Sequence, residues 1–215
     1  MEPRRLLVYG DSNTHGTAPM ARLGDLGRFD RATRWTTRFA QDLAPGWEVI
    51  EEGHPGRTTV HDDPVEGPHR NGLRILPALL ESHRPLDLVM VMLGTNDLKM
   101  RFSVGPADIA QGLERLAREI RISGTGPGGG APAVMLVAPP PIRETGCLAE
   151  IFAGGAAKSR GLGTAVRAAA GRCGAAFVDA ATLIAVSDLD GIHYDAKDNA
   201  ALAAGLAEAV HRHFG

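Results

Sequence analysis

Residues 6–17 read LLVYGDSNTHGT, a short apolar run that ends in a turn rich in glycine and hydroxyl-bearing residues. The run itself, Leu6 to Tyr9, has the length and composition of a buried β-strand. Gly10 and Asp11 then break it, and Ser12 follows directly. Such a turn can position a nucleophile, hold a phosphate group or simply lead the chain out of a sheet. Motifs elsewhere in the chain are needed to choose among these three interpretations.

Four more short apolar runs follow, and segments with helical periodicity separate them. We expect strands at 6–9, 47–50, 88–93, 133–137 and 176–178, and apolar helix faces within 35–43, 73–80, 109–120, 162–169 and 202–210. Strict alternation of strand and helix favours parallel strands joined by helical crossovers, so we expect a three-layer α/β domain. Ligands bind such sheets beyond the carboxyl ends of the strands.

Composition limits the class of protein. With 215 residues and 44% hydrophobic content, the chain is expected to form a single domain, residues 1–215. A net charge of −2 without a run of Lys or Arg argues against a nucleic-acid partner. We find no signal peptide and no stretch near the ~20 apolar residues of a membrane span, so we expect a cytoplasmic protein without a membrane partner. Cys147 and Cys173 have no metal-binding spacing and are interpreted as reduced, structural thiols.

Four short motifs follow the carboxyl ends of the expected strands. They are Gly10-Asp11-Ser12-Asn13, the segment 51–59, Gly94-Thr95-Asn96-Asp97 and, after a short connection, Asp190-Gly191-Ile192-His193. Each motif alone is typical of an ordinary turn. Together, on one rim of the sheet, they supply every part that nucleophilic acyl transfer requires.

A serine hydroxyl is too weakly acidic to attack an ester at pH 7 without help. An imidazole must take its proton, and a carboxylate must hold that imidazole in the correct tautomer. Ser12, His193 and Asp190 are the candidates for these roles. The three-residue spacing from Asp190 to His193 suits one turn of backbone, which would place the carboxylate beside Nδ1 while Nε2 faces Ser12.

The developing oxyanion needs fixed hydrogen-bond donors, each worth roughly 3–4 kcal/mol in well-studied hydrolases. Three donors are expected here. They are the backbone N–H of Ser12, the backbone N–H of Gly56 and the side-chain amide of Asn96.

Ser12, Gly56, Asn96 and His193 resemble the four defining residues of the SGNH, or GDSL-type, hydrolase family, with Asp190 as the third member of its triad. Further stretches resemble the bacterial arylesterase/acyltransferase branch of that family, namely RATRWT, VIEEG, RTT, DDP, RPLDLVMVMLGTND, APPP, IFAGG and DGIHYDAKDNAAL. The resemblance covers nearly the whole chain.

This resemblance implies a flavodoxin-like α/β/α fold with a five-stranded parallel sheet. It also implies hydrolysis of short-chain acyl or aryl esters without metal or other cofactor, and in some relatives acyl transfer to alcohols. Members of this branch assemble through long loops that enclose the active site, so the resemblance implies a homo-oligomer. The corresponding segments here are 17–34 and 140–155, both longer than simple turns require.

Residues next to these motifs are candidates for lining the substrate pocket: Asp11, Asn13, His15, His54 and Ile192. Relatives usually carry Leu and Trp after the serine, where this chain has Asn13 and His15. If that Trp keeps water from the acyl-enzyme, we expect less efficient transfer to alcohols here, with hydrolysis unaffected.

Other interpretations remain to be tested. The turn after the first strand also suits a flavodoxin-like module that binds FMN or phosphate, although this leaves Asn96 and the Asp190/His193 pair unexplained. A carbohydrate acetylesterase would use the same catalytic groups as an arylesterase. An α/β-hydrolase is disfavoured because Thr14 stands where the nucleophile elbow requires glycine. His61-Asp62-Asp63 resembles a fragment of a metal site, but three adjacent residues converge poorly on one ion.

Overall fold

The computed structural model describes residues 2–215, and in this part of the chain it contains one parallel sheet of five strands. The strands are β1 (Arg4–Gly10), β2 (Trp47–Gly53), β3 (Leu88–Met92), β4 (Ala133–Ala138) and β5 (Ala176–Asp179), in the order β2-β1-β3-β4-β5. The chain therefore moves from β1 to one edge and returns past it, which makes the carboxyl end of β1 the topological switch point of the sheet. All five predicted strands are present, and the predicted flavodoxin-like α/β fold is confirmed.

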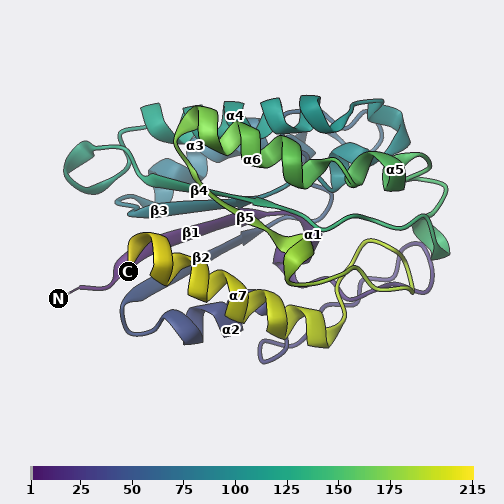
Figure 1. Ribbon diagram of the computed structural model, residues 1–215, viewed down its shortest axis with the longest axis horizontal. Coiled ribbons are helices and arrows are strands. Elements are labelled where there is room, and N and C mark those ends of the chain that lie inside the picture. The colour runs from purple at the N-terminus through teal and green to yellow at the C-terminus, as the bar shows by residue number, and fades with distance from the viewer. Residues whose placement is uncertain (1) are drawn as a thin grey trace.

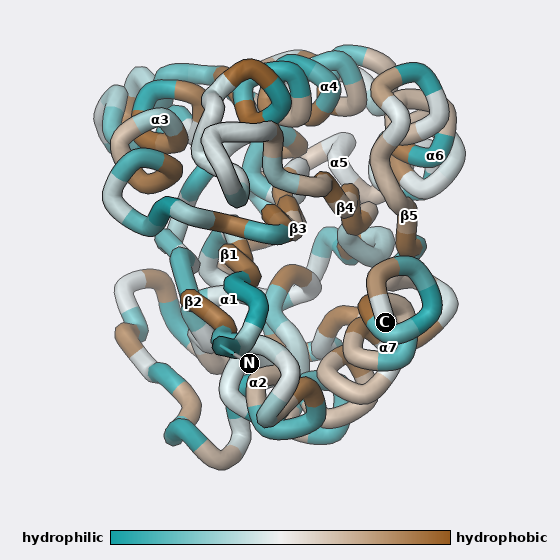
Figure 2. The backbone as a smooth tube through the Cα atoms, turned by 90° about the vertical axis from the view of Figure 1, so that its left-hand side faces the viewer, coloured by the Kyte–Doolittle hydropathy of each residue, from teal (hydrophilic) through white to brown (hydrophobic). Residues whose placement is uncertain are grey.

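Helices cover both faces of the sheet (Figures 1 and 2). On one face lie α2 (Trp35–Leu43) and α7 (Ala196–Phe214), and on the other lie α3 (Gly72–His83), α4 (Pro106–Ile122) and α6 (Leu162–Cys173). Two short helices, α1 (Ser12–His15) and α5 (Gly155–Ser159), lie in the connections at the carboxyl ends of the strands. The five predicted apolar helix faces fall within α2, α3, α4, α6 and α7, which gives the three layers.

The alternation of side chains along β1 explains the apolar run from Leu6 to Tyr9. Leu6 and Val8 pack into the core beneath α2 and α7, where they join Trp35. Leu7 and Tyr9 point to the opposite face and join the core beneath α3, α4 and α6. This part of the strand is covered on both faces and has no solvent side, so each position from Leu6 to Tyr9 is apolar, whereas Arg4 and Arg5 at the start of β1 are not buried.

The two long connections noted in the sequence, 17–34 and 140–155, lie beyond the carboxyl ends of the strands. A third, smaller apolar cluster joins the segment after β4 to the loops around it, with Leu98, Ile109, Ile142, Leu148, Phe152, Leu162 and Ile192 as its buried members. This packing fixes the rim of the sheet on which the predicted motifs lie. Within residues 2–215, none of the helices combines the length and apolar character needed to cross a membrane.

Candidate active site

Ser12 stands at the start of α1, directly beyond the end of β1. The carboxylate of Asp11 caps this helix by accepting the N–H of Asn13 at 3.0 Å. Asn13 in turn fixes the other side of the turn, because its Nδ2 donates to the carbonyl oxygen of Ile192 at 3.2 Å. The short helix is thus attached to the loop that carries the predicted base, although the two lie about 180 residues apart in sequence.

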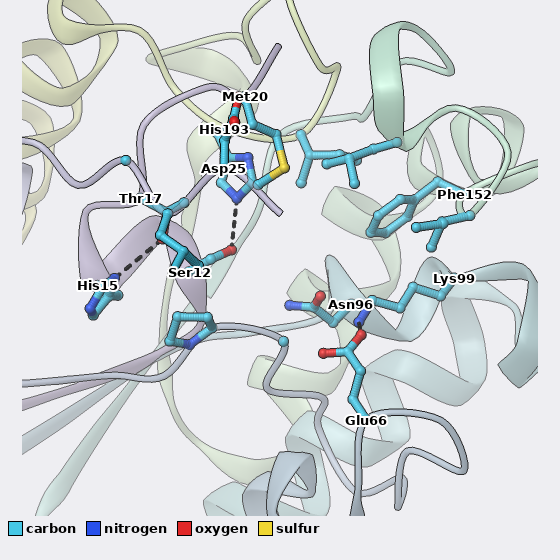
Figure 3. Close-up of a pocket in the computed structure, with 17 residues that line it drawn as sticks. Ser12, His15, Thr17, Met20, Asp25, Glu66, Asn96, Lys99, Phe152 and His193 are labelled. Atoms are coloured by element: carbon cyan, nitrogen blue, oxygen red, sulfur yellow. Dashed lines mark hydrogen bonds and ion pairs between the residues drawn. The ribbon is translucent and has the colours of Figure 1, made fainter. Parts of the chain in front are cut away.

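The three predicted triad residues form a continuous hydrogen-bonded chain. Nε2 of His193 lies 3.1 Å from Oγ of Ser12, the contact drawn as a dashed line in Figure 3. Nδ1 of His193 lies 2.7 Å from Oδ2 of Asp190. All three residues are buried, with Asp190 fully so. The loop from Asp190 to His193 turns this tightly at Gly191, whose φ of +75° favours glycine.

Asp190 receives more hydrogen bonds than the one from the imidazole. Its Oδ1 accepts the backbone N–H groups of Ile192 and His193 at 3.0 and 2.9 Å, and its Oδ2 accepts that of Met20 at 2.8 Å. Burial alone raises the pKa of Asp190, but these hydrogen bonds and the imidazole outweigh it and hold the pKa below its ordinary value. An ionised Asp190 holds the proton of the imidazole on Nδ1, which leaves Nε2 free to accept the proton of Ser12.

The two other predicted oxyanion donors, Gly56 and Asn96, face the same cavity as Ser12. Gly56 has a φ of +76°, so a side chain there would be strained, and its Cβ would lie 2.7 Å from Oε2 of Glu66, which would have to move. Asn96 begins a 3-10 turn, Asn96–Leu98, after β3, and its Nδ2 points to Oδ2 of Asp11 at 3.4 Å. Figure 3 shows its amide across the cavity from Ser12.

A buried carboxylate ties together the two loops that carry these donors. Asp97, next to Asn96, accepts the hydroxyl of Thr59 at 2.5 Å and the N–H of Thr59 at 3.0 Å. Thr59 belongs to the same loop as Gly56. Burial raises the pKa of Asp97, and the hydrogen bonds from Thr59 act against this rise.

The cavity above Ser12 has a volume of about 290 Å³. One wall is apolar and comes largely from the connection after β4, with Met20 added from the first long loop. Polar side chains also line the cavity, among them Lys99, which lies beside Phe152 and whose Nζ lies 2.5 Å from Oε1 of Glu66 (Figure 3). The apolar members are Met20, Leu26, Leu148, Ile151, Phe152 and Ile192.

The residues predicted to line the pocket divide into two groups. His15 and Ile192 line the cavity, whereas Asp11, Asn13 and His54 do not. Asp11 and Asn13 instead make the hydrogen bonds that hold the turn carrying Ser12. His54 lies behind the Gly56 loop, where burial, together with the charges of Arg57 and Arg70, lowers its pKa to about 4.

The positions of His61, Asp62 and Asp63 do not support the metal site that this stretch of sequence resembles in part. Asp62 binds Arg74 and Asp63 binds Arg101, while His61 points toward Asp97, so the three side chains diverge. Within residues 2–215, no three His, Cys, Asp or Glu side chains converge as metal ligands.

A phosphate in the turn after β1 would meet unfavourable groups. The carboxylate of Asp11 is buried in this turn, and the hydroxyl of Ser12 is already paired with His193. Burial raises the pKa of Asp11 to about 6, so at neutral pH the turn contains a negative charge. That charge disfavours the FMN- or phosphate-binding interpretation.

Comparisons with known proteins show which family and which solved structures this chain resembles. The model of the GDSL-like lipase/acylhydrolase family matches residues 8–211. The aryl esterase of M. smegmatis has a solved structure that is 40% identical, with 97% of this chain and 99% of that chain covered and a TM-score of 0.92. A carbohydrate acetylesterase from Sinorhizobium meliloti is 38% identical over 98% of this chain and 100% of its own, with a TM-score of 0.93. A search of curated proteins finds no match.

Proposed function

The chain belongs to the GDSL-like lipase/acylhydrolase family and is a carboxylic ester hydrolase, and from this premise we propose that it acts through an acyl-enzyme on Ser12. The observation that carries the proposal is the hydrogen-bonded chain from Ser12 through His193 to Asp190, which opens into a largely apolar cavity. A buried serine paired with an oriented imidazole is the arrangement that makes a hydroxyl nucleophilic at neutral pH.

In the first half of the reaction, Oγ of Ser12 attacks the carbonyl carbon of the ester while its proton passes to Nε2 of His193. The negative charge that develops on the carbonyl oxygen is stabilised by the N–H groups of Ser12 and Gly56 and by the amide of Asn96. When the tetrahedral intermediate collapses, His193 gives its proton to the departing alcohol.

Water completes the cycle. His193 takes a proton from a water molecule, the resulting hydroxide attacks the acyl carbon, and the same three donors stabilise the second oxyanion. The bond to Ser12 then breaks, and Oγ recovers its proton from His193. An alcohol that replaces this water would yield a new ester, and we include such acyl transfer as a side activity of the same site.

Small esters suit the cavity best. Its volume of about 290 Å³ and its wall of aliphatic side chains and Phe152 favour short acyl groups and flat aryl alcohols. The similarity to an aryl esterase supports this substrate class. A sugar acetate is the second candidate, because Glu66 and Asp25 line the cavity and offer polar partners to hydroxyl groups. A carbohydrate acetylesterase is also nearly as similar to this chain. Comparing phenyl acetate with acetylated xylose at equal concentration separates the two.

Assembly and location are part of the proposal. Leu26 lines the cavity yet is 95% exposed, and Leu23 and Met100 are also exposed. A second copy of the chain that covers these side chains would complete the wall of the cavity, so we place the enzyme in a homo-oligomer. Cys147 and Cys173 are free thiols, which is consistent with the cytoplasm.

The test is hydrolysis of p-nitrophenyl acetate by the wild type and by Ser12→Ala, with chelator present. We expect the wild type to remain active in the presence of the chelator. The activity of Ser12→Ala should be lower than that of the wild type by about 10³-fold or more. Ser123→Ala, which removes a hydroxyl beyond the far end of α4, is the matched control and should retain full activity. Equal activity of Ser12→Ala and wild type would overturn the proposal.

A further inference from the structure

Arg70 lies behind the loop that carries Gly56, outside the cavity. It ends a 3-10 turn, Pro68–Arg70, just before α3. Its Nη1 donates to the carbonyl oxygen of Pro55 and lies 3.3 Å from Nε2 of His54. Its Nε lies 3.2 Å from Oε2 of Glu66. One guanidinium therefore contacts two consecutive residues of this loop and a carboxylate in the wall of the cavity.

The carbonyl of Pro55 belongs to the same peptide unit as the N–H of Gly56. The two groups are conjugated across a planar bond, so a cation bound to the oxygen draws electron density from the nitrogen and fixes the plane in which the N–H lies. Hydrogen bonds that share such a group strengthen one another, and those involving an ion are the stronger kind. A charged donor on Pro55 thus makes the N–H of Gly56 a better donor.

Arg70 also restrains Gly56 itself. A Cβ on Gly56 would lie 2.7 Å from Oε2 of Glu66 and 3.0 Å from Nε of Arg70, so the ion pair packs directly against the α-carbon. This contact helps to hold the left-handed conformation that Gly56 adopts, with its φ of +76°.

The carboxylate of Glu66 needs to be neutralised at this position. Left unpaired, a negative charge so near Gly56 would oppose an oxyanion bound there. Oε1 of Glu66 lies 2.5 Å from Nζ of Lys99 and 2.6 Å from Nη2 of Arg101, and Oε2 faces Arg70. Figure 3 shows the contact between Lys99 and Glu66 beside Asn96. Three cations surround Glu66, which itself keeps Arg70 in place.

We propose that Arg70 is a positioning residue for ester hydrolysis, which acts by orienting and polarising the Pro55–Gly56 peptide so that the N–H of Gly56 binds the oxyanion. This inference rests on the proposed function, specifically on the role of Gly56. Arg70 itself touches neither the substrate nor the triad.

Arg70→Met removes the charge and all donors at similar length, and Arg70→Lys keeps the charge without the planar fork. We expect kcat for p-nitrophenyl acetate to fall by about tenfold to a hundredfold in Arg70→Met, less than for loss of a direct oxyanion donor, with KM within about twofold. Arg70→Lys should recover part of the loss. Arg74→Met is the matched control, because Arg74 forms its ion pair with Asp62 at the surface, and it should match the wild type.

Inhibition by phenylboronic acid distinguishes positioning from general damage to the structure. The boron accepts an electron pair from Oγ of Ser12, whose proton passes to His193, and the tetrahedral adduct places a boron-bound oxygen in the oxyanion site. We expect the inhibition constant to rise in Arg70→Met by the factor by which kcat/KM falls, because both report the same donor.

Wild-type kcat in Arg70→Met, or a fall in kcat with unchanged boronic acid affinity, would overturn the inference. If Arg70→Met does not fold, the same two comparisons are made with Arg70→Lys, where equal losses in kcat/KM and boronic acid affinity are again required. Failure of the proposed function looks different, because Ser12→Ala would then retain activity whatever the Arg70 variants do.

Discussion

The backbone N–H of Met20 donates to Oδ2 of Asp190 at 2.8 Å, across 170 residues of sequence. The same oxygen faces Nδ1 of His193 at 2.7 Å. Met20 belongs to the long connection between α1 and α2, and its side chain lines the cavity. This connection therefore helps to build the site in two ways, by closing one wall and by supplying a hydrogen bond to the proposed triad carboxylate.

The crowding of donors around Asp190 predicts a large effect of Asp190→Asn. Oδ1 accepts two backbone N–H groups, and Oδ2 accepts the N–H of Met20 and the imidazole. In either orientation, the amide nitrogen of the variant would face N–H donors. We expect kcat to fall by about 10⁴-fold and the melting temperature to fall as well.

Steady-state kinetics and thermal unfolding check this prediction side by side. Ser12→Ala serves as the control for stability, because it should abolish activity while leaving the melting temperature close to that of the wild type. An Asp190→Asn variant with near-normal kcat would show that the carboxylate does not orient His193.

The tie between Thr59 and Asp97 predicts a loss of stability in Thr59→Val. The change keeps the shape of the side chain and removes the hydroxyl that lies 2.5 Å from the buried carboxylate. We expect the free energy of unfolding to fall by about 2 kcal/mol, the typical value for a hydrogen bond to a charged group. Urea unfolding measures this, with Thr59→Ser as the control that retains the hydroxyl. An unchanged midpoint for Thr59→Val would mean that the backbone N–H of Thr59 suffices.

Asp11 predicts a pH dependence of stability. Burial raises the pKa of this carboxyl group from 3.8 to about 6 in the folded protein, so the folded state binds its proton more tightly than the unfolded state. The contribution of Asp11 to stability therefore decreases as pH rises from about 4 to about 6, and the cost remains above that range. Asp11→Asn retains a good helix cap and should be more stable than the wild type at pH 8.

Urea unfolding of both proteins between pH 4 and 8 checks this prediction, and the difference between them should grow up to about pH 6 and then level off. The activity of Asp11→Asn should fall despite the gain in stability, because the amide of Asn96 loses the carboxylate that it faces. A stability difference independent of pH would show that Asp11 is not the group that titrates.

From the position of His15 we predict that this residue affects the balance between hydrolysis and acyl transfer. It lines the cavity, and its Nδ1 lies 3.2 Å from Oγ1 of Thr17, so it adds a polar ring to the cavity wall. His15→Trp places an apolar ring there, and we expect the ratio of alcoholysis to hydrolysis to rise severalfold. Product analysis with p-nitrophenyl acetate and a primary alcohol in water gives the ratio. An unchanged ratio would exclude His15 as its determinant.

The strands, the helix faces and the parallel sheet could be predicted from the sequence. Positions buried in the core must be apolar, so a strand covered on both faces and a helix covered on one face each produce a recognisable pattern of apolar residues. The apolar run from Leu6 to Tyr9 and the helical stripe through Trp35 and Phe39 each occupy a single local segment. The candidate site residues could be predicted for a related reason. Ser12 and Asn96 lie in the turns that follow β1 and β3, and the carboxyl ends of parallel strands meet at one rim.

Contacts made by irregular loops could not be predicted in this way. Nothing in the neighbourhood of Met20 indicates that its N–H meets Asp190, and no periodicity links Arg70 to Pro55 or Glu66. His54 lies only two residues before Gly56 in sequence, yet it does not line the cavity. Such positions depend on the path of the chain between elements, which is set by tertiary packing and not by local pattern.

The most direct test of the account is to trap the covalent intermediate. Wild-type enzyme mixed with p-nitrophenyl acetate and quenched in acid should carry one acetyl group, and peptide mapping by mass spectrometry should place it on Ser12. The acid quench stops the second half of the reaction, in which the ester on Ser12 is broken down with His193 as the base. Two results would contradict the central claim. One is an acetyl group on a different residue in an intermediate that goes on to product, and the other is turnover during which no peptide containing Ser12 carries an acetyl group.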